Sequence, residues 1–178
     1  MKSAIVNAAN NRCLGGRGVD GAISAAGGEA LLHDRHALPI IHGTNSRCMT
    51  GNAVITGPNN YMHLKTPFVI HAVGPNYSNN KYKGSEEKGD IKLHNAYVAS
   101  MVCARDKGLE SVAFSLLSAG KFRGNRSIHE VLNIAMRAII LYAYGGLMEV
   151  HLCGHSHHEY LALIEVARDL GLIRELGA

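Results

Sequence analysis

Tryptophan is absent from this chain of 178 residues, and its apolar runs are short. Runs such as residues 138–141 fall far below the roughly 20 residues that a membrane-spanning helix requires, so a spanning segment is excluded. The first seven residues are too polar for a signal peptide, because Asn7 interrupts the apolar run. We therefore expect a cytoplasmic protein without a membrane partner.

Paired cysteines are lacking as well. The four cysteines, at positions 13, 48, 103 and 153, form no CxxC pair. This spacing excludes a disulfide framework and a zinc knuckle, and it predicts free thiols in a reducing compartment. The histidines at 155, 157 and 158 look like a metal cluster, but they lie over a helix start where their rings would diverge. We interpret them as a solvated helix start and expect no metal site.

Charged residues are few, at 18 %, and the net charge is only +4. No run of Lys and Arg is long enough to indicate a nucleic-acid-binding arm, although the mildly basic balance suits an anionic ligand. Hydrophobic types make up 47 %, which excludes general disorder and allows a sizeable core. We expect one domain over residues 1–178.

Short apolar segments alternate with helical patterns from end to end. We expect strands over 3–7, 52–56, 67–73, 111–117 and 149–153, and helices over 19–33, 85–107, from 127, and from 156 to about 170. Ser127 with Glu130, and Ser156 with Glu159, form capping boxes. In the helix over 19–33, one face carries Val19, Ile23, Ala26 and Ala30. The alternation predicts a three-layer α/β/α domain with a mixed, mostly parallel central sheet.

Glycine is frequent, at 20 residues, and two glycine-rich loops follow predicted strands. We name residues 8–18 loop one and residues 118–124 loop two. The glycines at 15, 16 and 18 let backbone N–H groups converge just before a helix begins, an arrangement that binds phosphate. The pattern Gly16-x-Gly18-x-x-Gly21 also matches a dinucleotide fingerprint, but residues 36–40 hold no acid for a ribose hydroxyl. A plain turn is the alternative.

Four stretches, in this order, resemble the macro domain family. The first stretch, over 7–23, begins with Asn-Ala-Ala-Asn and ends with Val-Asp-Gly-Ala-Ile. Between these two motifs lie two residues, Cys-Leu and a glycine run. The other three stretches are 48–56, 68–75 and 114–124. The resemblance covers about residues 4 to 153. It implies the family's fold, with ADP-ribose across the crest of the sheet and its diphosphate between the two loops.

The resemblance also implies roles for individual residues. Asn10 would hydrogen-bond the distal ribose, and Asp20 would orient that ribose or a water in the branch of the family that hydrolyses ADP-ribosyl esters. The implied ligand contacts are Ala9, Gly15, Gly16, Arg17, Gly18, Val19, Ser118, Ala119, Gly120, Lys121, Phe122 and Arg123. The implied reaction is metal-independent and cofactor-free hydrolysis of O-acetyl-ADP-ribose or of mono-ADP-ribosyl esters on proteins, which reverses ADP-ribosylation. Alternatively, Asn10 is a turn-former, and Asp20 caps the helix or lies in its first turn.

Two cations depart from the family pattern. Lys121 stands where the family usually has Ile or Val, and Arg17 lies within the glycine run. Either they add affinity for the diphosphate, or they point to solvent. Phe122 matches the aromatic residue that packs against the distal ribose. We assign no catalytic role to two other residues. His71 is interpreted as a packed strand residue, and Cys13 as an exposed thiol without an evident base.

The family usually begins with a further strand and a turn whose Asp binds adenine, and neither has a counterpart here. We therefore expect relaxed discrimination of the base. The strand over 149–153 should have an uncovered edge, which either the tail over 172–176 or a second copy of the chain would pair with. Three other functions remain open: a non-catalytic ADP-ribose reader, a nucleotide- or RNA-binding macro-like domain, and a dinucleotide-dependent oxidoreductase.

Overall fold

The computed structural model describes residues 2–79, 82 and 84–173, and its elements alternate as the sequence predicts. In chain order they are β1 (Ser3–Ala8), α1 (Val19–Ala37), β2 (Asn52–Thr56), β3 (Phe68–Val73), α2 (Glu86–Asp106), β4 (Ser111–Ser115), α3 (Ile128–Leu141), β5 (Glu149–Cys153) and α4 (His157–Asp169). A short 3-10 helix, Lys121–Arg123, lies in loop two.

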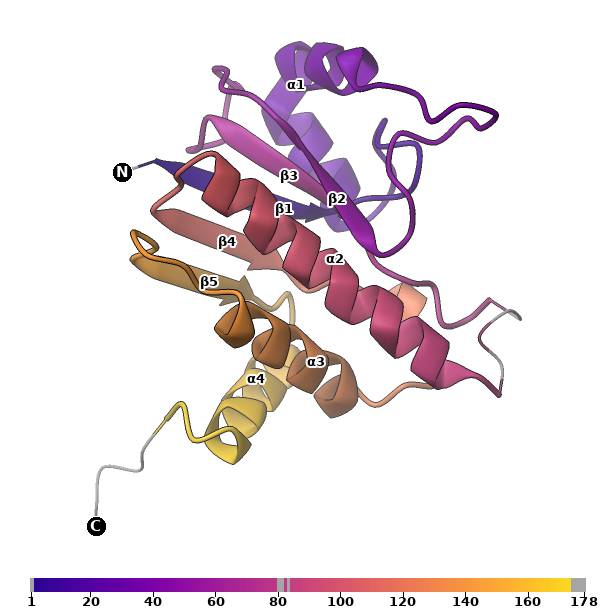
Figure 1. Ribbon diagram of the computed structural model, residues 1–178, viewed down its shortest axis with the longest axis vertical. Helices are drawn as coiled ribbons and strands as arrows, with labels where there is room; N and C mark the ends of the chain where they lie inside the picture. The colour runs from indigo at the N-terminus through magenta and orange to yellow at the C-terminus, as the bar shows by residue number, and fades with distance from the viewer. Residues whose placement is uncertain (1, 80–81, 83, 174–178) are drawn as a thin grey trace.

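The strands form one sheet in the order β2-β3-β1-β4-β5. β1 is parallel to both of its neighbours, and β4 is parallel to β5, whereas β2 is antiparallel to β3. The prediction of a mixed, mostly parallel sheet is confirmed. Figure 1 shows α2 crossing the near face of this sheet, with α3 beside it and α4 next to α3.

Alternate residues of β1 and β3 supply the two faces of the sheet, because strand side chains alternate. Ala4 and Val6 join the large core formed with α2 and α3, whereas Ile5 and Val69 pack with α1. Asn7 and His71, which are register partners in β1 and β3, share the parity of Ile5 and Val69. These two polar side chains therefore belong to the α1 face.

The predicted helix starts are confirmed. Ser127 and Ser156 both form complete capping boxes. Because the box at Ser156 opens α4, the neighbouring histidines lie at a helix start, and the ring of His157 stacks on Tyr160 at 6.1 Å. Ser85 precedes α2 but makes no capping hydrogen bond through its side chain.

The buried face of α1 differs from the predicted one. Its buried residues are Asp20, Ile23, Gly27, Leu31 and Arg35, whereas Val19 is 42 % exposed. The buried stripe follows the helical spacing i, i+3, i+7, and it begins and ends with a charge. The helix is also broken at Gly28, whose φ of 60° and ψ of −155° are not helical.

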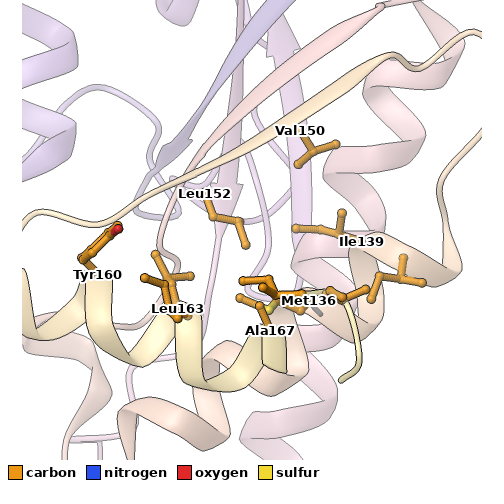
Figure 2. Close-up of a pocket in the computed structure, with 11 residues that line it drawn as sticks. Met136, Ile139, Val150, Leu152, Tyr160, Leu163 and Ala167 are labelled. Carbon is orange, nitrogen blue, oxygen red and sulfur yellow. The ribbon is translucent and has the colours of Figure 1, made fainter. Parts of the chain in front are cut away.

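β5 is an edge strand, as expected, and in the part of the chain that the structure describes it pairs with β4 alone. Beside it lies an apolar hollow of about 360 Å³, lined by residues of α3, β5 and α4 and by Leu172 and Ile173. Figure 2 shows Val150 and Leu152 of β5 on one side of this hollow and Leu163 and Ala167 of α4 on the other. The tail thus reaches the hollow, and the remaining predicted tail residues, 174–176, lie outside the described residues.

Within residues 2–79, 82 and 84–173, none of the helices combines the length and the apolar character needed to cross a bilayer.

Candidate functional site

The two glycine-rich loops leave the carboxyl ends of adjacent strands, where ligands bind in open α/β sheets. Ser115 ties these ends together: its hydroxyl donates to the Val6 carbonyl at 2.7 Å and accepts from the Ala8 N–H at 3.0 Å. Both contacts lie at the last residues of β1 and β4. The start of loop one is therefore fixed beside the start of loop two.

Loop two is anchored on its far side to the segment after β3. The Ser118 hydroxyl donates to the Pro75 carbonyl at 2.7 Å, and the Tyr77 N–H donates to the Phe122 carbonyl at 2.8 Å. Ser118 adopts a φ of 55°, a conformation that non-glycine residues rarely adopt, and this hydrogen bond helps to hold it there. Because β1 lies between β3 and β4, loop two passes over the end of β1 where loop one begins.

Asn10 organises loop one from within. Its Nδ2 donates to the Gly15 carbonyl at 2.9 Å, and its Oδ1 accepts from the Arg12 N–H at 3.0 Å. Gly15 has a φ of 101°, which only glycine adopts readily. The turn-forming alternative for Asn10 therefore describes part of its role. One amide hydrogen remains for another acceptor, because an amide NH₂ carries two.

Asp20 lies in the first turn of α1 and is only 3 % exposed. Its Oδ1 accepts from Asn7 Nδ2 at 2.8 Å and from Arg35 Nη2 at 3.0 Å. The carboxylate therefore does not cap the helix toward solvent. It is a buried charge paired with a cation that is itself 1 % exposed.

The buried polar contacts continue into the sheet through His71. Asn7 Nδ2 lies 3.3 Å from His71 Nδ1, and His71 Nε2 lies 3.1 Å from Thr56 Oγ1. Because Asn7 donates through this amide, Nδ1 accepts and the ring proton belongs on Nε2. Burial, aided by the positive charge of Arg35, lowers the pKa of His71 to about 3. His71 is a neutral, packed strand residue, as predicted.

Asn10 and Asp20 converge at Gly16. A side-chain carbon at Gly16 would lie 2.9 Å from Asp20 Oδ2 and 3.3 Å from Asn10 Nδ2. Oδ2 is buried and has no hydrogen-bond partner among the described residues, in contrast to Oδ1. Gly16 therefore covers the one unoccupied oxygen of the carboxylate without a side chain of its own.

The other predicted ligand residues fall into two groups. The exposed group lies at the surface of the two loops and consists of Gly16, Arg17, Gly18, Val19, Gly120, Lys121 and Phe122. The second group is less accessible: Ala9, Ser118 and Ala119 are buried, and Gly15 is half-buried. The guanidinium of Arg123 donates to the Ala119 and Arg126 carbonyls at 3.1 and 2.7 Å, so it supports loop two. Ligand contact by all of these residues stays a prediction.

Cys13 is fully buried, at 0 % exposure, so the expectation of an exposed thiol is wrong. It packs with Cys48 beneath loop one. A hydrogen bond with Cys48 lowers the pKa of the Cys13 thiol, although burial acts in the opposite direction. The same hydrogen bond raises the pKa of Cys48.

The sequence analysis assigns no role in the site to four residues that build it: Asn7, Ser24, Arg35 and Ser115. Arg35 carries a signal that could have found it. It continues the spacing of the buried stripe of α1, and a charge at a buried position requires a partner. Asp20, at the other end of the stripe, has the opposite sign.

A family model described as Macro domain matches residues 6–135. This stretch contains both loops and the buried polar contacts around Asp20. The chain belongs to the macro domain family. A macro domain-containing protein of Caldanaerobacter subterraneus subsp. tengcongensis is 38 % identical over 158 residues, which are 88 % of this chain and 83 % of that protein.

Two further comparisons bear on what such macro domains do. An O-acetyl-ADP-ribose deacetylase of Escherichia fergusonii is 41 % identical over 118 residues, which are 66 % of this macro domain and 60 % of that protein. A variant of the Oceanobacillus iheyensis macrodomain, solved with ADP-ribose, superposes with a TM-score of 0.79 at 31 % identity. That superposition covers 97 % of this chain and 88 % of the other.

Proposed function

We propose that this macro domain binds ADP-ribose between loop one and loop two and hydrolyses O-acetyl-ADP-ribose or mono-ADP-ribosyl esters of acidic side chains on proteins. The observation that carries the proposal is the convergence of Asn10 Nδ2 and Asp20 Oδ2 at Gly16. The two relatives described above, a deacetylase and a macrodomain solved with ADP-ribose, support the same substrate class.

Loop one offers the diphosphate a set of exposed backbone amides. Gly16 and Gly18 are exposed and directly precede α1, so their N–H groups and the start of the helix present partial positive charge to an anion. Gly120 in loop two has no atom within 4 Å of where a side-chain carbon would stand, which leaves room for a phosphate beside the backbone. Arg17 and Lys121 are exposed near these glycines and would add positive charge.

Hydrolysis needs a group that positions or deprotonates a water. In the proposed reaction a water oxygen attacks the ester, the bond to the leaving oxygen breaks, and the products are a carboxylic acid and a ribose hydroxyl. Asp20 Oδ2 is the free carboxylate oxygen of the site and accepts the hydrogen bond from that water. Because Oδ2 is enclosed, direct contact requires loop one to shift at its glycines.

A non-catalytic ADP-ribose reader is the second candidate, and one observation favours it. Asp20 is buried against Arg35, and Asn10 already bonds Gly15, so both groups also serve to shape loop one. A domain that only binds would need no more than this.

One pair of measurements separates the two candidates. Calorimetric titration with ADP-ribose reports binding, and mass spectrometry with enzyme in excess reports cleavage of O-acetyl-ADP-ribose and of an ADP-ribosylated glutamyl peptide. We expect binding and cleavage of at least one ester. Binding without any cleavage would establish the reader, and absence of binding would refute both.

A further inference from the structure

Arg35 is the largest of the fully buried side chains, and it lies at the end of α1 away from the loops. A buried guanidinium is costly unless it is paired and hydrogen-bonded. Its Nη1 and Nη2 meet this requirement at Ser24 and Asp20, in the first two turns of its own helix, whereas its buried Nε has no hydrogen-bond partner among the described residues. Its contacts there define what it does to Asp20.

The Arg35 guanidinium holds both the side chain and the backbone of Asp20. Nη2 donates to Asp20 Oδ1 at 3.0 Å, and Nη1 donates to the Ser24 hydroxyl at 2.7 Å. That hydroxyl donates in turn to the backbone carbonyl of Asp20 at 2.6 Å. The guanidinium thus fixes the position of the residue as well as the direction of its carboxylate.

The two carboxylate oxygens are consequently unlike. Oδ1 accepts from both Arg35 and Asn7, whereas Oδ2 accepts from neither and lies beside Gly16. Rotation of the carboxylate would break two hydrogen bonds to a buried oxygen. The free oxygen is therefore held toward loop one.

We propose that Arg35 is a positioning residue for ester hydrolysis, which aims Asp20 Oδ2 at the substrate side of loop one. This inference rests on the proposed hydrolase function. Arg35 itself does not reach the substrate, because its side chain is only 1 % exposed, although its Nη1 also lies close to Gly15 of loop one. It acts through Asp20, and it should therefore govern turnover more than binding.

The test compares Arg35→Gln, which keeps an amide donor without charge, with Arg35→Lys, which keeps the charge. We expect Arg35→Gln to lower kcat for O-acetyl-ADP-ribose on the order of 100-fold, with little change in affinity for ADP-ribose. Arg35→Lys should restore most of kcat. Val131→Ala, a buried substitution in α3, controls for lost stability.

Each outcome decides the matter. A folded Arg35→Gln protein with the kcat of the wild type overturns the inference and leaves the hydrolase function standing. A folded Arg35→Lys protein as slow as Asp20→Asn also overturns it, and this variant decides the question if Arg35→Gln does not fold. A wild-type protein that binds ADP-ribose but cleaves no ester refutes the hydrolase function itself, and the inference with it.

Discussion

Arg35 Nη2 lies 3.0 Å from Asp20 Oδ1, although 15 residues of the same helix separate them. In a straight α-helix that separation corresponds to about 22 Å along the axis, which no arginine side chain can span. The break at Gly28, between the two residues, redirects the second half of α1. The ion pair at the site therefore depends on a glycine that belongs to neither loop.

Gly28 should accordingly tolerate no side chain. Its φ of 60° and ψ of −155° lie in a region that essentially only glycine adopts, which costs another residue about 1–3 kcal/mol, and a side-chain carbon would also overlap the Met62 sulfur. We expect Gly28→Ala to lower the free energy of unfolding by more than this strain alone. Gly108→Ala is the matched control, because Gly108 has the same φ of +60° and nothing within 4 Å. Equal losses in urea denaturation of the two variants would contradict the role given to Gly28.

Gly120 tests where the diphosphate lies. A side chain at this exposed position meets nothing within 4 Å, so Gly120→Glu should fold with a free energy of unfolding within about 0.5 kcal/mol of the wild type. Its carboxylate would repel the diphosphate, and we expect affinity for ADP-ribose to fall at least tenfold, or about 1.4 kcal/mol. Gly145→Glu, equally open but in the turn before β5, should bind normally. Unchanged affinity in Gly120→Glu would place the ligand elsewhere.

The apolar hollow beside β5 predicts a role for the end of the chain. Leu172 and Ile173 line this hollow next to the edge strand, so removing residues 172–178 should expose it. We expect that deletion to lower the melting temperature and to promote self-association in light scattering. Deletion of 174–178 alone keeps both lining residues and serves as the control. A stable monomer after the longer deletion would contradict this prediction.

Local sequence signals predicted most of the fold. β5 and β2 begin and end where alternation and turn residues place them, and both capping boxes form because each needs only residues three apart. The edge position of β5 was also expected. The buried face of α1 was not predicted correctly. Its two central glycines and the flanking alanines are small on every side, so no apolar stripe stands out from the rest of the helix surface.

The candidate site was predicted only in part, for a related reason. Loop one revealed Asn10 and Asp20 through its motif, but a motif does not show which way a carboxylate points. The burial of Asp20 follows from Asn7, His71 and Arg35, which reach it from two strands and from beyond the break in α1. Such contacts depend on sheet order and on the φ of Gly28, neither of which a spacing rule contains.

The most direct test of the proposed hydrolase is the single-turnover cleavage of O-acetyl-ADP-ribose by the wild type and by Asp20→Asn. In both reactions the enzyme is in excess, so that all of the substrate is bound. Asp20→Asn keeps the shape of the side chain but cannot accept the water proton. Because the substitution also leaves the buried Arg35 without its anion, thermal melting must show that the variant is folded. We predict that the wild type cleaves the ester and that the folded Asp20→Asn protein binds ADP-ribose but cleaves at least about tenfold more slowly. Equal cleavage rates in the two proteins would contradict the account.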